Sequence, residues 1–205
     1  MQTSMLHEQD MDALDKAIQT INSGGIVAFP TDTVYGIGTG AFDQMGIQRL
    51  FDIKKRDTNK AIAILLSDLS QLSLVCSSTS NYAARLGAAF WPGALTLVVP
   101  RHPSIPDLIS PLPTIGVRIP DHPFAQALIH VCGPLAVTSA NISGQPSPTN
   151  AQEVMLQMDG LVDLVIDGGR SKIGISSTVV DCTGPIYQIL REGSISEEQI
   201  NRAIG

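Results

Sequence analysis

Two short apolar stretches of the chain each end in a cluster of hydroxyl-bearing residues bracketed by glycine. The first stretch is 25–36, with the sequence GIVAFPTDTVYG, and the second is 134–144, with the sequence PLAVTSANISG. Ligands of open α/β sheets bind beyond the carboxyl ends of strands. A cationic triplet, Lys54, Lys55 and Arg56, stands between the two stretches in the chain. Together these features predict a site for an anionic ligand.

The cationic triplet is expected at the end of a helix. Asp43 can cap this helix, and its buried stripe would be formed by Ile47, Leu50 and Phe51. One more step of the same period places Lys54 in the last turn. Read without context, the triplet fits a solvated basic helix end equally well.

Strand and helix patterns alternate along the rest of the chain. Strands are expected at 26–29, 61–66, 95–99, 116–119, 135–138, 164–166, 177–181 and 187–191. Helices are expected up to residue 22 and at 69–75, 81–89 and 151–158, with one more capped by Asp121 and a last one opened by a capping box at 196–199. The alternation indicates an α/β protein, and the short turn at 183–185 predicts an antiparallel hairpin, so the sheet should be mixed.

Length and composition limit the classes of protein. With 205 residues, 43% of them hydrophobic, we expect one domain over 1–205, with residues 1–11 as an amino-terminal extension. The domain would be a twisted mixed sheet flanked by helices, with a concave cationic ligand site. The net charge of −6 disfavours a protein that coats nucleic acid, although a local basic pocket stays open. The stretch 100–113 is the one long irregular segment, and it could act as a lid.

The cysteines and histidines lack the spacing of a metal site or a disulfide framework, and buried thiols and structural imidazoles are favoured; these residues are Cys76, Cys132, Cys182, His7, His102, His122 and His130. No apolar run reaches the roughly 18 residues of a membrane span, and the amino terminus has no apolar signal core. We therefore expect a cytoplasmic protein. For Trp91, packing in a turn is favoured over stacking on a base.

Seven sequence blocks follow one another in the chain. They are PTDTVYG at 30–36, KKR at 54–56, WPGALT at 91–96, GVRIP at 116–120, TSANISG at 138–144 with SPT at 147–149, STVVD at 177–181 and REG at 191–193. In this order the blocks resemble those of the YrdC/Sua5 family of threonylcarbamoyl-AMP synthases. The resemblance runs from about Asp12 to the carboxyl terminus, and the chain is similar to the short form of the family.

The resemblance implies a reaction in which L-threonine, bicarbonate and ATP, with Mg²⁺, yield L-threonylcarbamoyl-AMP and pyrophosphate. A downstream threonylcarbamoyl transferase complex then modifies an adenine of tRNA, so this chain itself would contact tRNA weakly or indirectly. An anionic carbamate must attack a polyanionic triphosphate, and catalysis would come mainly from positioning and charge screening. No covalent nucleophile and no metal held by protein side chains are needed.

The family's site residues carry over to matching positions. The paired signatures are Lys54 with Arg56 and Ser139 with Asn141, where Arg56 offers a bidentate fork for phosphate and Lys54 a point charge. Nucleotide contacts would come from Arg56, Lys60, Thr114, Ser139, Ser147 and Arg191. The L-threonine subsite would be formed by Thr33, Arg118, Val137 and Ser177.

Several of these residues also have structural interpretations. Ser147 could cap a helix, Arg191 could form a surface ion pair, and Val137 could belong to the core. Asp32 could cap its loop or help to orient a hydrated magnesium ion held by phosphates. Arg118 lies in an apolar strand, where an unpaired charge is costly, and this favours function.

Three positions depart from the family pattern. Asp57 replaces a common proline and would weaken anion binding unless it points away, Leu65 stands where many members have histidine, and Glu192 replaces a proline and should loosen the loop that carries Arg191. Two other functions stay open at this stage. The chain could be an RNA-binding module of the same fold, or it could transfer a carbamoyl or adenylyl group to another amine.

Overall fold

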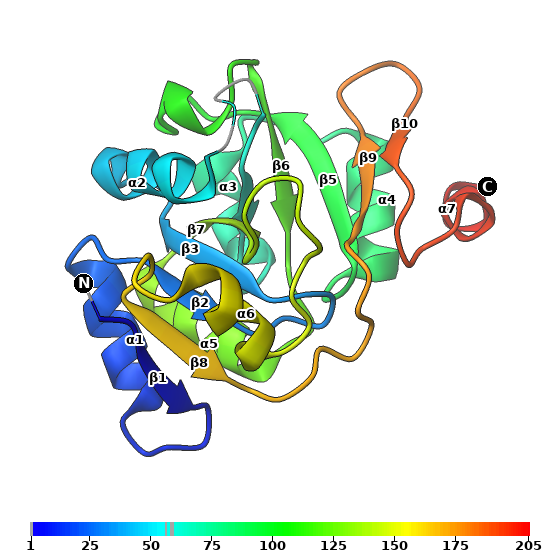
Figure 1. The fold of residues 1–205 in the computed structure, drawn as a ribbon. Coiled ribbons are helices and arrows are strands. Elements are labelled where there is room, and N and C mark those ends of the chain that lie inside the picture. Colours follow the sequence, from blue (N-terminus) through cyan, green and yellow to red (C-terminus); the bar gives the residue numbers. More distant parts are fainter. Residues whose placement is uncertain (1, 56, 58–59) are drawn as a thin grey trace.

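The computed structural model describes residues 2–55, 57 and 60–205. Within this part of the chain, strands form one mixed sheet in the order β1-β8-β2-β3-β7-β4-β6-β5-β9-β10 (Figure 1). Their bounds are β1 Ser4–His7, β2 Val27–Phe29, β3 Gly36–Gly40, β4 Ala63–Leu65, β5 Leu95–Pro100, β6 Thr114–Arg118, β7 Leu135–Ser139, β8 Leu164–Asp167, β9 Thr178–Asp181 and β10 Gln188–Arg191. The sheet contains both parallel pairs, such as β2 with β8, and antiparallel pairs, such as β9 with β10, which confirms the mixed sheet and the carboxyl-terminal hairpin.

Helices cover both faces of the sheet (Figure 1). They are α1 Ala13–Asn22, α2 Gln44–Lys54, α3 Leu72–Val75, α4 Asn81–Phe90, α5 Pro123–Cys132, α6 Ala151–Met158 and α7 Glu197–Ile204, with short 3₁₀ turns η1 at Leu69–Gln71 and η2 at Asp107–Ile109. The helices α1 and α5 enclose one hydrophobic core with β2, β7 and β8. A larger core on the other face takes in residues of α2, α4, α6 and α7.

The local sequence of α2 explains where it starts and stops. The carboxylate of Asp43 accepts hydrogen bonds from the backbone N–H groups of Met45 and Gly46, a cap that typically contributes about 1 kcal/mol. Its predicted stripe is buried, and burial of each such side chain stabilises by roughly 1.5–3 kcal/mol. The helix ends at Lys54, and its C-cap Lys55 has a left-handed φ of 49°. Lys54 therefore lies in the last turn, as predicted, but it is buried, with only 1% of its surface exposed.

The sequence patterns did not reveal β3, because glycine is depleted in strands and three of its five residues are glycine. The structure shows why glycine is present. A Cβ atom at Gly36 or Gly38 would lie 2.7 or 2.8 Å from a methyl group of Val137 on the neighbouring β7. The glycines let β7 approach closely and keep Val137 at the wall of the cavity described below.

Several expected elements differ in detail. The predicted amino-terminal extension contributes β1, which pairs in parallel with β8 at the sheet edge. The predicted cap Asp121 was wrong, because His122 is the N-cap of α5 and the Asp121 backbone instead donates to the Asp32 carboxylate at 3.1 Å. The helix expected at 69–75 is a 3₁₀ turn followed by one short helix, and the strand expected at 61–66 is shorter.

The stretch 100–113 is fastened to the core. Ile105 and Ile109 are buried, and the Ile109 carbonyl accepts a hydrogen bond from the Ile62 backbone at 2.8 Å. The segment is thus packed in this structure and is not raised as an open lid. Cys76 and Cys182 are buried and Cys132 is half-buried, all as free thiols, as expected. A search of the described residues for a membrane-crossing helix found no candidate.

Candidate active site

A cavity of about 380 Å³ lies between the β2–β3 connection, β4, β5, β6, β7 and the carboxyl-terminal hairpin. Its volume is in the range of small-molecule sites. Six of the predicted site residues line it, and they come from five separate parts of the chain: Thr33, Arg118, Val137, Ser139, Ser177 and Arg191. The fold therefore gathers all four residues of the predicted threonine subsite, together with Ser139 and Arg191 of the predicted nucleotide subsite, into one cavity.

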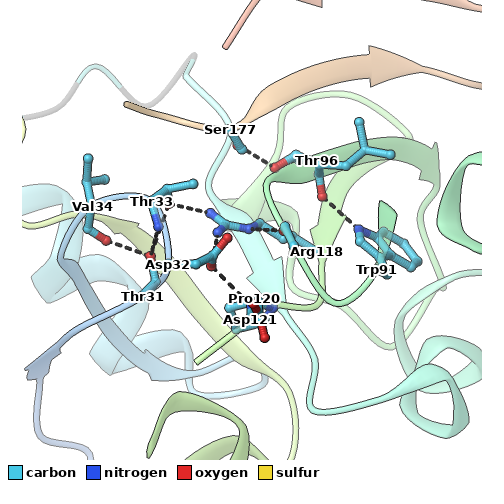
Figure 2. A network of polar contacts seen from close by, with 12 residues as sticks. Thr31, Asp32, Thr33, Val34, Trp91, Thr96, Arg118, Pro120, Asp121 and Ser177 are labelled. Carbon is cyan, nitrogen blue, oxygen red and sulfur yellow. Dashed lines mark hydrogen bonds and ion pairs between the residues drawn. The ribbon is translucent and has the colours of Figure 1, made fainter. Parts of the chain in front are cut away.

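Arg118 is the most constrained side chain of this cavity (Figure 2). Its guanidinium donates from Nε to the Gly93 carbonyl at 2.9 Å, from Nη1 to Thr33 Oγ1 at 2.8 Å, and from Nη2 to the Asp32 carboxylate. Burial lowers the pKa of Arg118 and the charge of Asp32 raises it, and the guanidinium stays protonated because its ordinary pKa is so high. A guanidinium has five N–H donors, so two more are available to a carboxylate ligand.

Asp32 sets the orientation of Arg118. Its side chain is 3% exposed, and the oxygen that pairs with Arg118 also accepts the Asp121 backbone N–H. The preceding turn is stabilised by Thr31, whose hydroxyl donates to the Val34 carbonyl at 2.7 Å and accepts the Thr33 backbone N–H at 3.2 Å. The Asp32 carboxylate thus forms a buried ion pair with Arg118, a role that differs from the loop cap and the magnesium contact suggested by the sequence.

Two hydroxyls and a cation converge on the opposite side of the cavity. Ser177 Oγ lies 2.8 Å from Thr96 Oγ1, and Arg191 donates to the Ser177 carbonyl at 2.8 Å and to its hydroxyl at 3.2 Å. Burial lowers the pKa of Arg191, which remains charged for the same reason as Arg118. The predicted site did not include Thr96, which ends the block 91–96. A threonine buried in a strand that borders the cavity is the signal that could have identified it.

The loop that carries Arg191 is fixed by backbone contacts. Thr178 Oγ1 accepts the backbone N–H groups of Gly193 and Ile195 at 3.0 and 3.1 Å. A Cβ at Gly193 would lie 2.2 Å from the Ser176 carbonyl oxygen, so only glycine allows this approach. These bonds hold the loop in spite of Glu192, and the loosening expected from that substitution stays a prediction.

Lys54 binds the backbone of the polar loop that begins at Ser139, at the end of β7. Its ammonium donates to the carbonyls of Ser139 and Asn141 at 2.5 Å each, which excludes the solvated helix end considered for this residue. Ser139 Oγ donates in turn to Asn141 Oδ1 at 2.5 Å, and Asn141 Nδ2 donates to the Gln145 carbonyl at 2.8 Å. Lys54, from the first paired signature, thus contacts both residues of the second signature through their backbone carbonyls.

Other predicted nucleotide contacts lie outside the cavity wall. Lys60 is exposed, Thr114 is half-buried at the start of β6, and Ser147 lies 3.5 Å from Asn141 Oδ1. Ser147 does not cap α6, whose N-cap is Asn150. Arg56 falls outside the residues that the structure describes.

The structure also shows the surroundings of Trp91, Leu65 and Asp32. Trp91 packs against the core and donates from its indole nitrogen to the Leu95 carbonyl at 2.7 Å, as the packing interpretation predicts. Leu65, one of the departures from the family pattern, lines the cavity with an apolar side chain. The described part of the chain holds no group of three or more His, Cys, Asp or Glu side chains that could bind a metal ion. Asp32, the carboxylate that the sequence suggested for orienting a hydrated magnesium ion, is paired with Arg118 instead.

The fold and the cavity define an α/β protein with a small-molecule cavity that cationic and hydroxyl-bearing side chains line. A family model for Sua5, YciO and YrdC, described as "Telomere recombination", matches residues 19–193, and the chain belongs to this family.

Relatives and solved structures agree with this assignment. The threonylcarbamoyl-AMP synthase of Bacillus subtilis is 40% identical over 193 residues, and that of Pyrococcus abyssi is 41% identical over 187 residues. The matches cover 93% and 90% of this chain but only 56% and 55% of those relatives. The structure of P. abyssi Sua5 complexed with L-threonine superimposes with a TM-score of 0.95 at 38% identity, covering 100% of this chain and 61% of that one.

Proposed function

We propose that this protein forms L-threonylcarbamoyl-AMP and pyrophosphate from L-threonine, bicarbonate and ATP. The observation that carries the proposal is the Arg118 fork, held by Asp32 and facing a cavity that Thr33 and Ser177 also line. The related Sua5 of P. abyssi was solved with L-threonine. Because the match covers only 56% and 55% of the B. subtilis and P. abyssi relatives, the activity of those complete proteins is carried over here only as part of this proposal.

L-threonine would bind with its carboxylate on Arg118. The two unused N–H donors of the guanidinium match a carboxylate, and a charge-assisted contact of this kind is among the strongest that a site can offer. The threonine hydroxyl would meet the hydroxyls of Thr33 or Ser177, and its methyl group would meet the apolar wall near Val137 and Leu65. This arrangement would leave the amino group free to form the carbamate with bicarbonate.

ATP would lie toward Ser139 and Arg191. A carbamate oxygen attacks the α-phosphorus, a new P–O bond forms, and the bond to the pyrophosphate oxygen breaks. Charge accumulates where two anions meet, and Arg191 and the buried Lys54 ammonium would stabilise it without reorganisation during the reaction. The family signature adds Arg56 as a phosphate contact. Mg²⁺, bound to ATP, would screen the triphosphate, and the phosphates would be its main ligands.

The product would pass to a threonylcarbamoyl transferase complex in the cytoplasm that modifies tRNA. We expect any direct contact of this chain with tRNA to be weak and to fall steeply with salt, because the whole chain carries a net charge of −6. Tight and salt-resistant tRNA binding by the isolated protein would instead support the RNA-binding module considered from the sequence.

Identification of the product tests this proposal. The protein is incubated with ATP, Mg²⁺ and ¹³C-bicarbonate together with each proteinogenic amino acid in turn, and the adenylates are analysed by mass spectrometry. We expect an adenylate of threonine that carries one heavy carbon, with a smaller amount for serine. A labelled adenylate of a different amine in place of threonine would favour the other transfer reaction, and absence of any labelled adenylate would contradict the proposal.

A further inference from the structure

A second cavity, of about 570 Å³, lies apart from the candidate active site. It opens beyond the carboxyl ends of three neighbouring strands, because Glu8 follows β1, Pro30 follows β2 and Gly168 follows β8. These strands run parallel to one another, with β8 between β1 and β2. The first turn of α5 closes the cavity from the other side, through His122 and Phe124. Beyond the ends of parallel strands is where α/β sheets bind ligands.

Three residues that line this second cavity have buried polar atoms without a hydrogen-bond partner. These atoms are Glu8 Oε2, His122 Nδ1 and Ser171 Oγ, and Ser171 is only 8% exposed. A buried polar atom that lacks a partner is costly, typically by about 1–3 kcal/mol, and therefore indicates a missing partner. When the imidazole carries its proton on Nε2, the nitrogen 3.8 Å from Glu8 Oε2, the Glu8 and His122 atoms can only accept a hydrogen bond, whereas the Ser171 hydroxyl can donate or accept one.

Side chains of both charges line the second cavity. Glu8 supplies a carboxylate, while Arg170 and Lys172 are exposed cations. The positive end of the α5 dipole also faces the cavity, and its N-cap residue His122 makes no side-chain capping bond. Phe124, together with Pro30, Pro123 and Ala127, provides an apolar wall. A positively charged donor on a ligand would pair with the Glu8 carboxylate, and a negatively charged group would pair with Arg170 and Lys172.

We infer that the second cavity binds a small zwitterion of the α-amino-acid class, with its ammonium group at Glu8 and its carboxylate toward Lys172, Arg170 and the amino terminus of α5. The Ser171 hydroxyl bonds to the carboxylate, and the side chain of the ligand lies against Phe124.

The loop 30–33 borders both cavities, because Pro30 lines the second cavity and Thr33 lines the candidate active site. The segment with Ser171 and Lys172 is bonded to it, because Ile173 N donates to the Asp32 carbonyl and Gly174 N to the Thr33 carbonyl, both at 2.9 Å. His122 follows Asp121, whose backbone donates to the Asp32 carboxylate. A ligand in the second cavity therefore acts on the residues that hold Arg118, and this consequence alone rests on the proposed function.

Amide NMR on the full chain tests the inference without any enzymatic readout. Each proteinogenic L-amino acid and, separately, inorganic phosphate are titrated into the wild type, Glu8→Gln, Lys172→Ala and the control Glu197→Gln on α7. We expect at least one amino acid to shift the amides of 122–127 and 168–172. Its affinity should fall about ten-fold or more in Glu8→Gln and about two- to five-fold in Lys172→Ala, and stay unchanged in the control.

Three results would overturn the inference: shifts confined to the residues of the candidate active site, shifts at the second cavity with phosphate and no amino acid, or no shift there at all. If Glu8→Gln does not fold, Lys172→Ala decides, since Lys172 is exposed and its truncation leaves the core intact. Because product formation is not measured, failure here and failure of the proposed synthase reaction are separate results.

Discussion

The buried ion pair between Asp32 and Arg118 gives the sharpest prediction about the site. In Asp32→Asn the carboxylate becomes a neutral amide of the same shape, and the Arg118 guanidinium, whose side chain is 8% exposed, loses the negative charge with which it pairs. Removal of one member of a buried pair typically costs about 3–5 kcal/mol. The amide oxygen can still accept the Asp121 N–H, so we expect the lower end, about 3 kcal/mol of unfolding free energy.

Urea unfolding without ligand measures this change, and the chain offers a matched control. Asp107→Asn removes the carboxylate of the pair with Arg101, where the Asp107 side chain is 94% exposed, and exposed pairs contribute about 0–1 kcal/mol. The double variant Asp32→Asn with Arg118→Met should be destabilised by less than the sum of its single changes, because it leaves no unpaired buried charge. An Asp32→Asn protein as stable as the Asp107→Asn control would refute the reasoning.

Three further predictions concern specificity, phosphate contact and pH. Ser177→Ala should narrow the preference for threonine over valine about five-fold, since a neutral hydrogen bond contributes about 1 kcal/mol. The threonine-to-serine ratio of kcat/KM should stay nearly unchanged, and an unaltered valine ratio would remove Ser177 from the hydroxyl site. Arg56→Lys should lower turnover about ten-fold or more because it loses the bidentate fork, while Lys55→Ala should be mild, and equal losses would contradict the assignment. Burial lowers the pKa of His122, so the unfolded state binds the proton more readily, and stability should decrease as pH falls below about 6.5; in His122→Gln this part of the pH dependence of unfolding should be missing.

Periodicity and capping rules predicted the elements that carry the site. Asp43 caps α2, the apolar stripe is buried, and the carboxyl-terminal hairpin forms where the turn was expected. These features depend on neighbours within a few residues, so they can be seen in a sequence. By contrast, β3 was missed because Gly36 and Gly38 serve contacts with Val137, about 100 residues away in the chain.

The sequence identified six of the side chains that line the cavity, but it missed Thr96 and did not show how the site residues pair. The motifs identified Arg118, and burial in a strand indicated that it must have a partner, but only the fold shows that this partner is Asp32. In the same way, the sequence placed Lys54 at a helix end, whereas its burial beneath the Ser139 loop depends on how β7 meets α2. Contacts that join distant segments are set by packing of the whole sheet, and local patterns do not encode them.

The proposed reaction is tested most directly by pyrophosphate release under defined combinations of substrates. The nucleophile is the carbamate, which forms only from L-threonine and bicarbonate together. Release from ATP should therefore need both, and it should stay at the background level in degassed buffer that contains threonine alone or in buffer with bicarbonate alone. Equal release with and without bicarbonate would contradict the account.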